Sequence, residues 1–396
     1  MPQHRFASIH VVGTNGKSSV AEMAGALLEA HGKRTGVYLS PHTERWSERV
    51  RIGGAEIEAG EFAAAAERVA QSVEVVNRAL EEGESVTQFE AVTAIAFVAL
   101  ASAGVDFGVI EAGLGGRLDA TNVLPSRVTA LTSVGLEHTE WLGETEEEIA
   151  AEKLAVLRDH SALVLGRVGE GVRELAERTA AQRSARLIPA WDPRPEFRLA
   201  VAGAYQRRNF AVAMAAAQEI IGRLDPDRVE AVAEGLELPG RVQLLKGAPP
   251  LILDAAHNPD GARALAEALS EAAGEAPVVA CLAILADKDA AGVLRALAPR
   301  LDVAVCTELP AERLARAGRP GARSLDASRL AELADASGIA RTEVVGRPDE
   351  ALRRAVAVAS ERGGVTLVTG SHYLLGYAAG ASLEQDGEAS AKREVK

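Results

Sequence analysis

Short β-rich runs alternate with helical segments along almost the whole chain, and this alternation constrains the fold more than any other feature. The candidate strands read, in chain order, "ASIHVV", "TGVYLS", "FGVIEA", "VTALTSV", "ALVLG", "LILDAA", "PVVACLAIL", "DVAVCTEL" and "VTLVTG". Between them lie amphipathic or alanine-rich segments typical of helices, such as residues 19–31, 89–103, 145–158, 207–223 and 261–273. Strands separated by helices predict an α/β protein with parallel sheets covered on both faces by helices. Ligands bind such sheets at the carboxyl ends of the strands, where the glycine-rich turns of this chain fall.

The chain is long enough for two domains, because 396 residues exceed the size at which a single core usually stops growing. Proline and glycine interrupt the helical pattern in "LELPGRVQLLKGAPP" (residues 236–250), and a new α/β series follows. We therefore predict an N-terminal domain with a phosphate-loop-type parallel sheet over residues 1–239 and a smaller Rossmann-like domain over residues 240–380. Residues 381–396 are polar and aperiodic, which predicts a disordered tail.

Composition excludes several classes of partner. The formal net charge of −13 argues against nucleic acid, which needs a basic face. The N-terminus does not resemble a signal peptide, and no apolar run is long enough to span a bilayer, so we expect a cytoplasmic protein without a membrane partner. Cys281 and Cys306 lie in apolar, strand-like runs, which predicts two buried, reduced thiols.

The stretch "HVVGTNGKSSV" (residues 10–20) joins a predicted strand to a predicted helix. Backbone N–H groups and a helix N-terminus then point at one spot, an arrangement that binds anions. Lys17 can neutralise outer phosphates, and Ser18 or Ser19 can reach a magnesium ion. The spacing is not that of the usual P-loop, because Val11 stands where the first glycine belongs. The alternative is an ordinary strand–helix turn.

Two further strand ends carry candidate metal or phosphate ligands. Glu111 ends the apolar run "FGVIE", and a carboxylate at that edge suits Mg²⁺, which takes few protein ligands. His138 follows "LTSVGLE" and is a candidate ligand or phosphoryl contact. The acidic run "ETEEEIAAE" opens a helix, where most of its carboxylates favour the helix dipole from a solvated face. Lys153 on that helix faces either the phosphate site or solvent, and its spacing does not decide between them.

The second half of the chain offers weaker signals, each with an ordinary structural explanation. Asp254 ends the run "LILD" before the turn "AHNP" and is a candidate for holding a ribose hydroxyl. Arg241 lies in the predicted domain boundary, from which it is expected to reach phosphates.

In this order, from about residue 10 to residue 376, these stretches resemble the Mur ligase superfamily, and within it the folylpolyglutamate synthase/dihydrofolate synthase family. "GTNGKSS" resembles the family's phosphate loop, "SPHTERWSERVRIGG" its segment with a serine metal ligand, and "GLEH…EEIAAEK" its histidine ligand and carbamylated lysine. "TQFEAVTAIAF" and "GLGGRLDATNV" resemble its pterin- and folate-facing elements. "QRRN", "PGR", "DAAHNP" and "DKD" resemble its nucleotide-contacting and C-terminal motifs.

The resemblance implies a role for each matching residue. The ATP phosphates would be held by Gly13, Thr14, Asn15, Gly16, Lys17, Ser18 and Ser19, and the nucleotide contacted from the second half of the site by Asn209, Arg241 and Asp254. Magnesium would be bound by Ser40, Glu111 and His138, with a second ion on Lys153 once it is carbamylated. Lys17, His138 and Lys153 would be the catalytic residues. The folate-type substrate would contact Thr87, Phe89, Leu114, Gly115, Gly116, Arg117 and His257.

The implied reaction adds L-glutamate to a folate or dihydropteroate carboxylate. ATP first converts the carboxylate to an acyl phosphate, and the amino group of glutamate then expels phosphate. Two anions must meet, so metal ions, lysine and helix N-termini have to offset their charge. The resemblance also implies a monomer, two Mg²⁺ ions and a possible monovalent cation.

The sequence departs from the family pattern at several points. The loop reads "GKSS" where glycine usually follows the lysine, Ala255 stands at a usual glycine, and "EKLAVLR" replaces a glycine-containing turn. Only "MPQHRF" precedes the first strand, where a helix and loop usually help to bind the pterin. We therefore expect the ATP site to follow the family more closely than the pterin site. Two alternatives stay open: a Mur-type amino-acid ligase for a non-folate carboxylate, and a nucleotide-binding protein without ligase activity.

Overall fold

The computed structural model describes residues 1–190 and 198–378, and these form two compact units. The first unit comprises Met1–Ala200 and Tyr205–Leu236, and the second comprises Val201–Ala204 and the chain from Glu237 onward. The predicted disordered tail, residues 381–396, lies outside the described residues.

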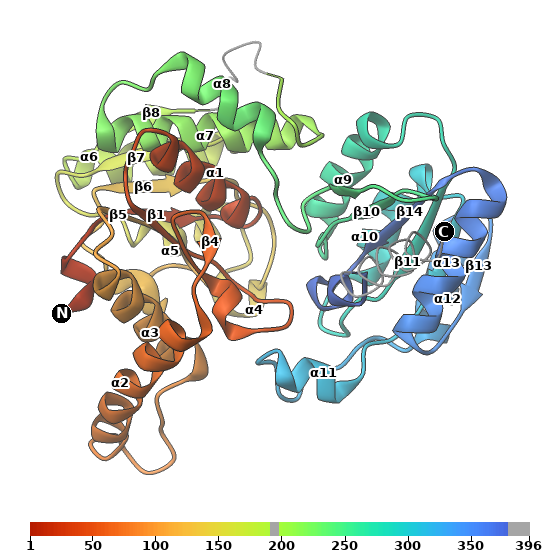
Figure 1. The fold of residues 1–396 in the computed structure, drawn as a ribbon, viewed down its shortest axis with the longest axis horizontal. Coiled ribbons are helices and arrows are strands. Elements are labelled where there is room, and N and C mark those ends of the chain that lie inside the picture. The colour runs from red at the N-terminus through yellow and green to blue at the C-terminus, as the bar shows by residue number, and fades with distance from the viewer. Residues whose placement is uncertain (191–197, 379–396) are drawn as a thin grey trace, which may run out of the picture. The chain divides into compact units, whose positions relative to one another are not determined.

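The first unit is built on an eight-stranded sheet with the order β4-β3-β2-β5-β1-β6-β7-β8 (Figure 1). Its strands are β1 (Ala7–Val12), β2 (Thr35–Tyr38), β3 (Val50–Ile52), β4 (Ala55–Glu56), β5 (Phe107–Glu111), β6 (Val128–Leu131), β7 (Ala162–Leu165) and β8 (Arg186–Pro189). Its helices are α1 (Lys17–Ala30), α2 (Ala59–Asn77), α3 (Gln88–Ser102), α4 (Thr139–Leu142), α5 (Glu146–Leu154), α6 (Glu170–Gln182), α7 (Ala204–Ile221) and α8 (Pro226–Gly235), with short 3₁₀ turns η1 (Pro2–His4), η2 (Trp46–Arg49) and η3 (Ala120–Val123).

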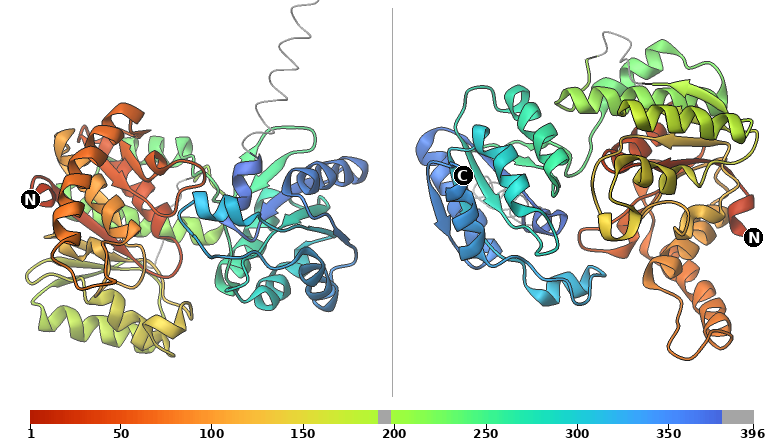
Figure 2. Two further views of the ribbon diagram at one scale, coloured as in Figure 1. Left: turned by 90° about the horizontal axis from the view of Figure 1, so that it is seen from below. Right: turned by 180° about the vertical axis from the view of Figure 1, so that it is seen from behind.

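Alternating side chains divide this sheet into two buried faces. Tyr38 and Ile110 pack with α3, and Val12 and Leu131 pack with α5 and α6. On the opposite face Gly25 of α1 lies against Val37, and α8 packs on α1 (Figures 1 and 2). The covered strands are parallel, as predicted. Helices cover both faces of such a sheet, so its strands carry apolar side chains on both faces. The sequence pattern missed the antiparallel edge made by β3 and β4, which are too short for a recognisable alternation.

The second unit is built on a six-stranded sheet with the order β13-β12-β11-β14-β10-β9, in which only the edge strand β9 is antiparallel. Its strands are β9 (Gln243–Leu245), β10 (Leu251–Leu253), β11 (Val278–Leu282), β12 (Val303–Cys306), β13 (Thr342–Val344) and β14 (Val365–Thr369). Its helices are α9 (Pro259–Ala272), α10 (Ala290–Leu297), α11 (Ala311–Arg316), α12 (Ala327–Ala336) and α13 (Pro348–Arg362), with the 3₁₀ turn η4 (Ala298–Arg300).

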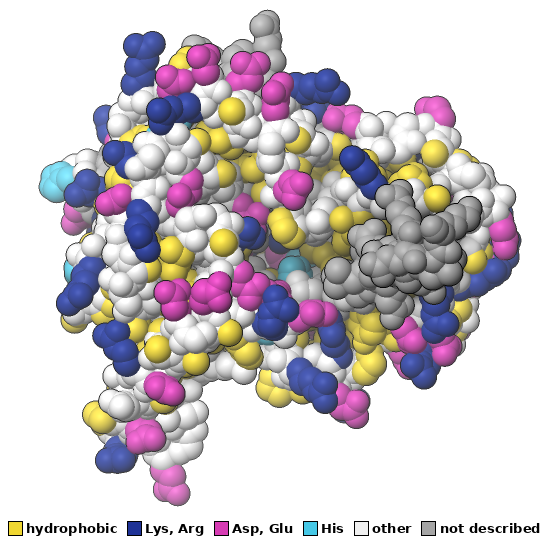
Figure 3. All heavy atoms as spheres, in the orientation of Figure 1, with side chains coloured by type: hydrophobic (Ala, Val, Ile, Leu, Met, Phe, Trp, Pro, Cys, Tyr) yellow, Lys and Arg dark blue, Asp and Glu magenta, His cyan; other side chains and the backbone are white. Residues whose placement is uncertain are grey.

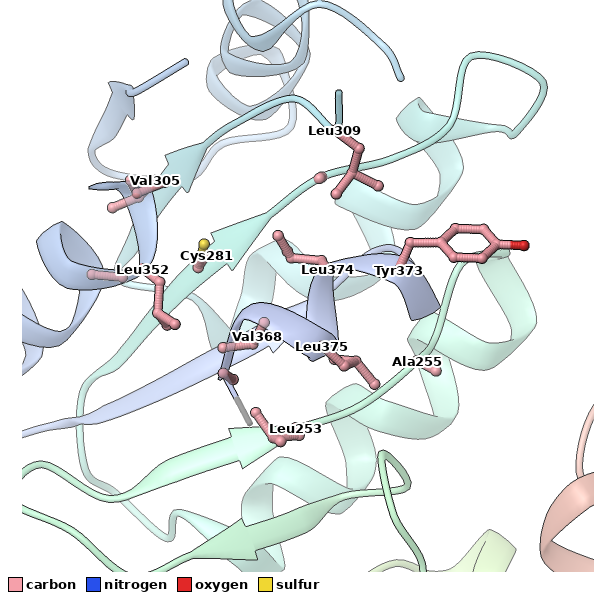
Figure 4. Packing of buried hydrophobic residues seen from close by; sticks show 14 of the residues in the cluster. Leu253, Ala255, Cys281, Val305, Leu309, Leu352, Val368, Tyr373, Leu374 and Leu375 are labelled. Atoms are coloured by element: carbon pink, nitrogen blue, oxygen red, sulfur yellow. The ribbon is translucent and has the colours of Figure 1, made fainter. Parts of the chain in front are cut away.

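The core of the second unit shows why its sequence predicts buried strands. Cys281, Val305 and Val368 project from neighbouring strands toward Leu352 of α13 and Leu374 (Figure 4). Both cysteines are buried free thiols, as predicted, and burial raises the pKa of each to about 12. They therefore act as small apolar side chains.

Candidate active site

A short loop, residues 13–16, joins β1 to α1 at the carboxyl edge of the first sheet. It is fixed by the residues that follow β6: the Thr14 N–H donates to the Ser133 carbonyl (2.8 Å), and the Asn15 carbonyl accepts from the hydroxyls of Thr132 (2.6 Å) and Ser133 (3.0 Å). Gly16 precedes the helix with a φ of 84°, and no side chain caps the first turn of α1. The first N–H groups of this helix thus have no capping side chain and suit an anion.

Close contacts explain both glycines of this loop. A Cβ on Gly13 would lie 2.0 Å from the Thr132 hydroxyl, and one on Gly16 would lie 2.6 Å from Asn209 Oδ1. Asn209 therefore lies against the phosphate loop, and its side-chain amide also donates to Gln206. Asn209 belongs to α7 of the first unit. Grouping it with Arg241 and Asp254 in the second half of the site was therefore wrong about its position.

Two lysines meet at the carbonyl of Gly13. Lys17 Nζ donates to the carbonyls of Gly13 and Thr14 (3.0 Å each), and Lys153 Nζ donates to that of Gly13 (3.1 Å). Lys153 is only 4% exposed, so the solvent-facing alternative for this residue is wrong. Burial, followed by the charge of Lys17, lowers the pKa of Lys153 to about 7. A substantial part of this amine is therefore neutral at physiological pH.

Glu111 brings two other predicted ligands together. It ends β5 with an exposure of 2%, and its two carboxylate oxygens accept from the Ser18 hydroxyl and from the Ser40 N–H, each at 3.0 Å. Of the two loop hydroxyls that the sequence left open, Ser18 is the one directed at Glu111, while Ser19 is buried in α1. The Glu111 carboxylate and the Ser18 hydroxyl are hard oxygen ligands of the kind that Mg²⁺ prefers, and Mg²⁺ usually completes its shell with phosphate oxygens and waters.

The other predicted metal ligand, His138, lies beside α4. It precedes the first turn of that helix in the left-handed region, with a φ of 52°, and its Nε2 is 3.9 Å from a carboxylate oxygen of Glu137. Within residues 1–190 and 198–378, no three His, Cys, Asp or Glu side chains gather as a ready-made metal site. A magnesium site here has to be completed by hydroxyls, water and the phosphates of the nucleotide.

The glycine-rich turn after β5 packs against the helix that carries Lys153. A Cβ on Gly116 would lie 2.6 Å from the Glu152 carbonyl and 2.9 Å from that of Lys153. Arg117 pairs with the Glu152 carboxylate (2.8 Å), and its N–H donates to the Glu152 carbonyl (3.1 Å). The missing side chain at Gly116 thus allows the helix to pack closely. Position 115 favours glycine for another reason, because its φ of 66° lies in the left-handed region. Leu114 is partly exposed at the tip of this turn.

Phe89 and Thr87, both predicted substrate contacts, lie at the start of α3. The Phe89 ring covers Gly113, where a Cβ would be 2.3 Å from the ring, and Tyr38 is its aromatic neighbour at 6.4 Å. Thr87 caps α3: its side chain accepts from the Glu90 N–H, and the Glu90 carboxylate accepts from Thr87 in return. This capping box is a structural role of Thr87 that does not depend on a bound ligand.

The remaining predicted residues lie in the second unit. Both carboxylate oxygens of the buried Asp254 accept backbone N–H groups, from Val242 (2.9 Å) and Ala256 (2.8 Å). Asp254 thereby holds the chain on both sides, next to Arg241 and to His257, whose Nδ1 contacts the Ala255 carbonyl. Burial raises the pKa of Asp254, an effect that the nearby Arg241 opposes.

Sequence reasoning missed the residues that hold the phosphate loop, Thr132 and Ser133. The predicted strand "VTALTSV" includes both residues, whereas β6 ends at Leu131, so the signal was two polar residues near the end of an otherwise apolar run. A hollow of about 450 Å³ lies at the other end of β6 and β7, beside Arg127 and His160, and none of the predicted site residues lines it.

The surface charges and the helices bear on two expected absences, those of a nucleic-acid partner and of a membrane partner. On the face shown in Figure 3, Lys and Arg side chains are interspersed with Asp and Glu rather than gathered in a basic patch. In the part of the chain that the structure describes, no helix is both long and apolar enough to cross a membrane.

Comparisons with known proteins define the class. Residues 240–372 match the family model described as "Mur ligase, glutamate ligase domain". With the phosphate-loop unit that precedes it, this domain defines a Mur-type ligase.

Relatives define the family more narrowly. The chain is 34% identical over 345 residues to the dihydrofolate synthase/folylpolyglutamate synthase of Mycobacterium tuberculosis, a match that covers 77% of this chain and 71% of the relative. The chain belongs to the dihydrofolate synthase/folylpolyglutamate synthase family.

Solved structures agree with this membership. Folylpolyglutamate synthase of Mycobacterium tuberculosis, complexed with ADP and AMPPCP, has a TM-score of 0.87 at 30% identity and covers 96% of this chain and 92% of its own. A bifunctional folylpolyglutamate synthase/dihydrofolate synthase with Mn, AMPPNP and L-glutamate bound has a TM-score of 0.79 at 32% identity, over 96% of this chain and 89% of its own.

Proposed function

We propose that this chain joins L-glutamate to a folate-type carboxylate, with ATP as the energy source. The observation that carries the proposal is the convergence of Lys17, Lys153 and the Ser18–Glu111–Ser40 group around one phosphate loop. Relatives of similar fold have been solved with nucleotide, a divalent metal and L-glutamate. A family member with this loop and these side chains has what the reaction needs.

The chemistry follows from the charges that must meet. A carboxylate oxygen of the acceptor attacks the γ-phosphorus of ATP and ADP leaves, which gives an acyl phosphate. The amino nitrogen of glutamate then attacks the acyl carbon, phosphate leaves, and the nitrogen loses a proton. Lys17 and the N-terminus of α1 offset the negative charge of the phosphates.

Magnesium fits the oxygen ligands around Glu111. Ser18, Glu111 and Ser40 would hold it, with His138 as a further ligand, and it would neutralise developing charge on the phosphates. We also propose that Lys153 is carbamylated and holds a second ion, since its amine is buried beside the loop and partly neutral. The proposal further includes nucleotide contacts from Asn209, Arg241 and Asp254. It includes substrate contacts from residues 114–117, Thr87, Phe89 and His257, and a monomeric enzyme. Light scattering on the full chain tests the monomer, and exchange of K⁺ for Na⁺ tests a monovalent-cation requirement.

Phosphate release by the purified protein tests the function. The reactions contain ATP, Mg²⁺ and L-glutamate with dihydropteroate, with a reduced folate monoglutamate, or with no acceptor. Release with dihydropteroate identifies a dihydrofolate synthase, and release with folate alone identifies a tail-extending enzyme. Lys17→Met serves as the control, because it should abolish release in every reaction.

Two outcomes contradict the proposal. Silence with both acceptors, in a protein that still binds ATP, redirects the search to a non-folate carboxylate. If no phosphate is released with any of a wide panel of carboxylates, the remaining alternative is a nucleotide-binding protein without ligase activity.

A further inference from the structure

A chain of buried hydrogen bonds leads from β1 to the glycine-rich turn. His10 Nε2 lies 2.8 Å from the Thr121 hydroxyl, and that hydroxyl donates to Asp119 Oδ1. The other carboxylate oxygen of Asp119 accepts the Leu114 N–H at 2.8 Å. His10 and Thr121 are both completely buried, although 111 residues separate them in the sequence.

The direction of each bond in this chain is determined by its acceptor. An ionised carboxylate only accepts, so the single hydroxyl proton of Thr121 goes to Asp119. Thr121 Oγ1 must then accept from His10, which places the imidazole proton on Nε2. The Thr121 N–H adds another bond to Asp119 Oδ1 at 2.9 Å. Asp119 is thus oriented by Thr121, and Thr121 by His10.

The turn itself is held from two sides. On one side Gly116 and Arg117 lie against Glu152 of α5. On the other side, the Leu114 N–H donates to Asp119, which ties the tip of the turn to the buried interior. Since β1 continues directly into the phosphate loop, His10 connects the strand of the nucleotide site with this turn.

We propose that His10 and Thr121 are positioning residues which, through Asp119, hold the turn 113–117 in the shape that receives the acceptor substrate. The inference rests on the proposed function, in which that turn contacts the folate-type acceptor. The proposal gives His10, a buried histidine on β1, a role on the acceptor side of the site.

Matched variants of the full chain test the proposal. Thr121→Val removes the hydroxyl and keeps the shape, while Thr121→Ser keeps the hydroxyl. His10→Leu removes the donor, while His10→Gln keeps an N–H donor near the position of Nε2. We expect Thr121→Val and His10→Leu to raise the KM for the acceptor about tenfold, with the KM for ATP changed less than about twofold. Thr121→Ser and His10→Gln should stay within about threefold of the wild type.

Amide hydrogen exchange gives a readout that needs no activity. Leu114 is 42% exposed, yet the proposal requires its N–H to exchange slowly in the wild type and faster in Thr121→Val than in Thr121→Ser. Fast exchange in the wild type overturns the proposal, even if the variants fail to fold. An unchanged acceptor KM in folded Thr121→Val also overturns it, as does equal loss in Thr121→Ser. A wild type that is inactive with folates but protects Leu114 would contradict only the proposed function.

Discussion

At the scale of single residues, burial changes the acid–base chemistry of Lys153 and His10. A buried amine or imidazole loses the hydration of its charged form, so its pKa falls. Lys153 and His10 both show this effect, with pKa values of about 7 and about 3. The consequence differs, because Lys153 lies beside the phosphate loop and His10 lies within the sheet.

Lys153 should accept CO₂ as a carbamate. Only the neutral amine reacts, and with a pKa of about 7 the neutral form grows as the pH rises through neutrality. We expect a ¹³C carbamate signal from protein in labelled bicarbonate and Mg²⁺, stronger at pH 8 than at pH 6. Lys153→Gln should lack the signal, and a wild-type protein without it at pH 8 would refute the carbamate.

His10 should make the protein sensitive to acid. Burial, and then the charge of Arg158, lower its pKa from 6.5 to about 3. Between these values the unfolded chain binds a proton that the folded one does not, so the free energy of unfolding falls as the pH drops. From pH 6.5 to pH 5 this difference amounts to about 2 kcal/mol.

Urea unfolding of the wild type and His10→Gln at both pH values measures this contribution. The variant should lose less stability on acidification than the wild type. Equal losses would mean that folded His10 binds its proton in the same pH range as unfolded His10, so that burial does not lower its pKa.

At the scale of elements, glycines determine how closely loops and helices approach. Gly116 has the carbonyls of α5 in the place of a side chain, while Gly60 in the first turn of α2 has nothing within 4 Å. The same residue type therefore has a packing role at one position and none at the other.

The substitution Gly→Ala should separate these two positions. Gly116→Ala forces α5 away from the turn and should lower the free energy of unfolding by about 1–3 kcal/mol. Gly60→Ala should raise it by up to about 1 kcal/mol, since alanine favours a helix. Urea unfolding of both variants measures the effects, and equal values would show that the approach of Gly116 to α5 carries no energetic cost.

At the scale of the whole molecule, each unit has its own sheet and its own buried core. In the second unit β14 lies between β11 and β10, so its side chains complete the core from the centre of the sheet (Figure 4). We propose these units as the folding domains of the chain. A sheet with a complete core can fold without a neighbour.

A fragment of residues 237–396 should therefore unfold cooperatively by itself. A fragment of residues 237–364, which lacks β14, serves as the control and should not fold. Circular dichroism during heating distinguishes the two. A non-cooperative melt of the longer fragment would make the units parts of one folding domain.

The sequence by itself determined the local features of this protein. Alternating strands and helices, the glycine loop after β1 and the residues at the ends of β5 and β10 are all visible in patterns of a few neighbouring residues, because the backbone responds to near neighbours. The family resemblance rests on the same local motifs. The capping of α3 by Thr87 is likewise readable from "TQFE".

Only the tertiary structure decided which of these side chains are buried and which residues they contact. Lys153 contacts the Gly13 carbonyl across 140 residues of chain, and Ser18 rather than Ser19 faces Glu111 across 93 residues. The bond between His10 and Thr121 had no signal in the local pattern. Burial and pairing depend on how sheets and helices pack, and packing joins residues whose spacing in the sequence carries no trace of their contact.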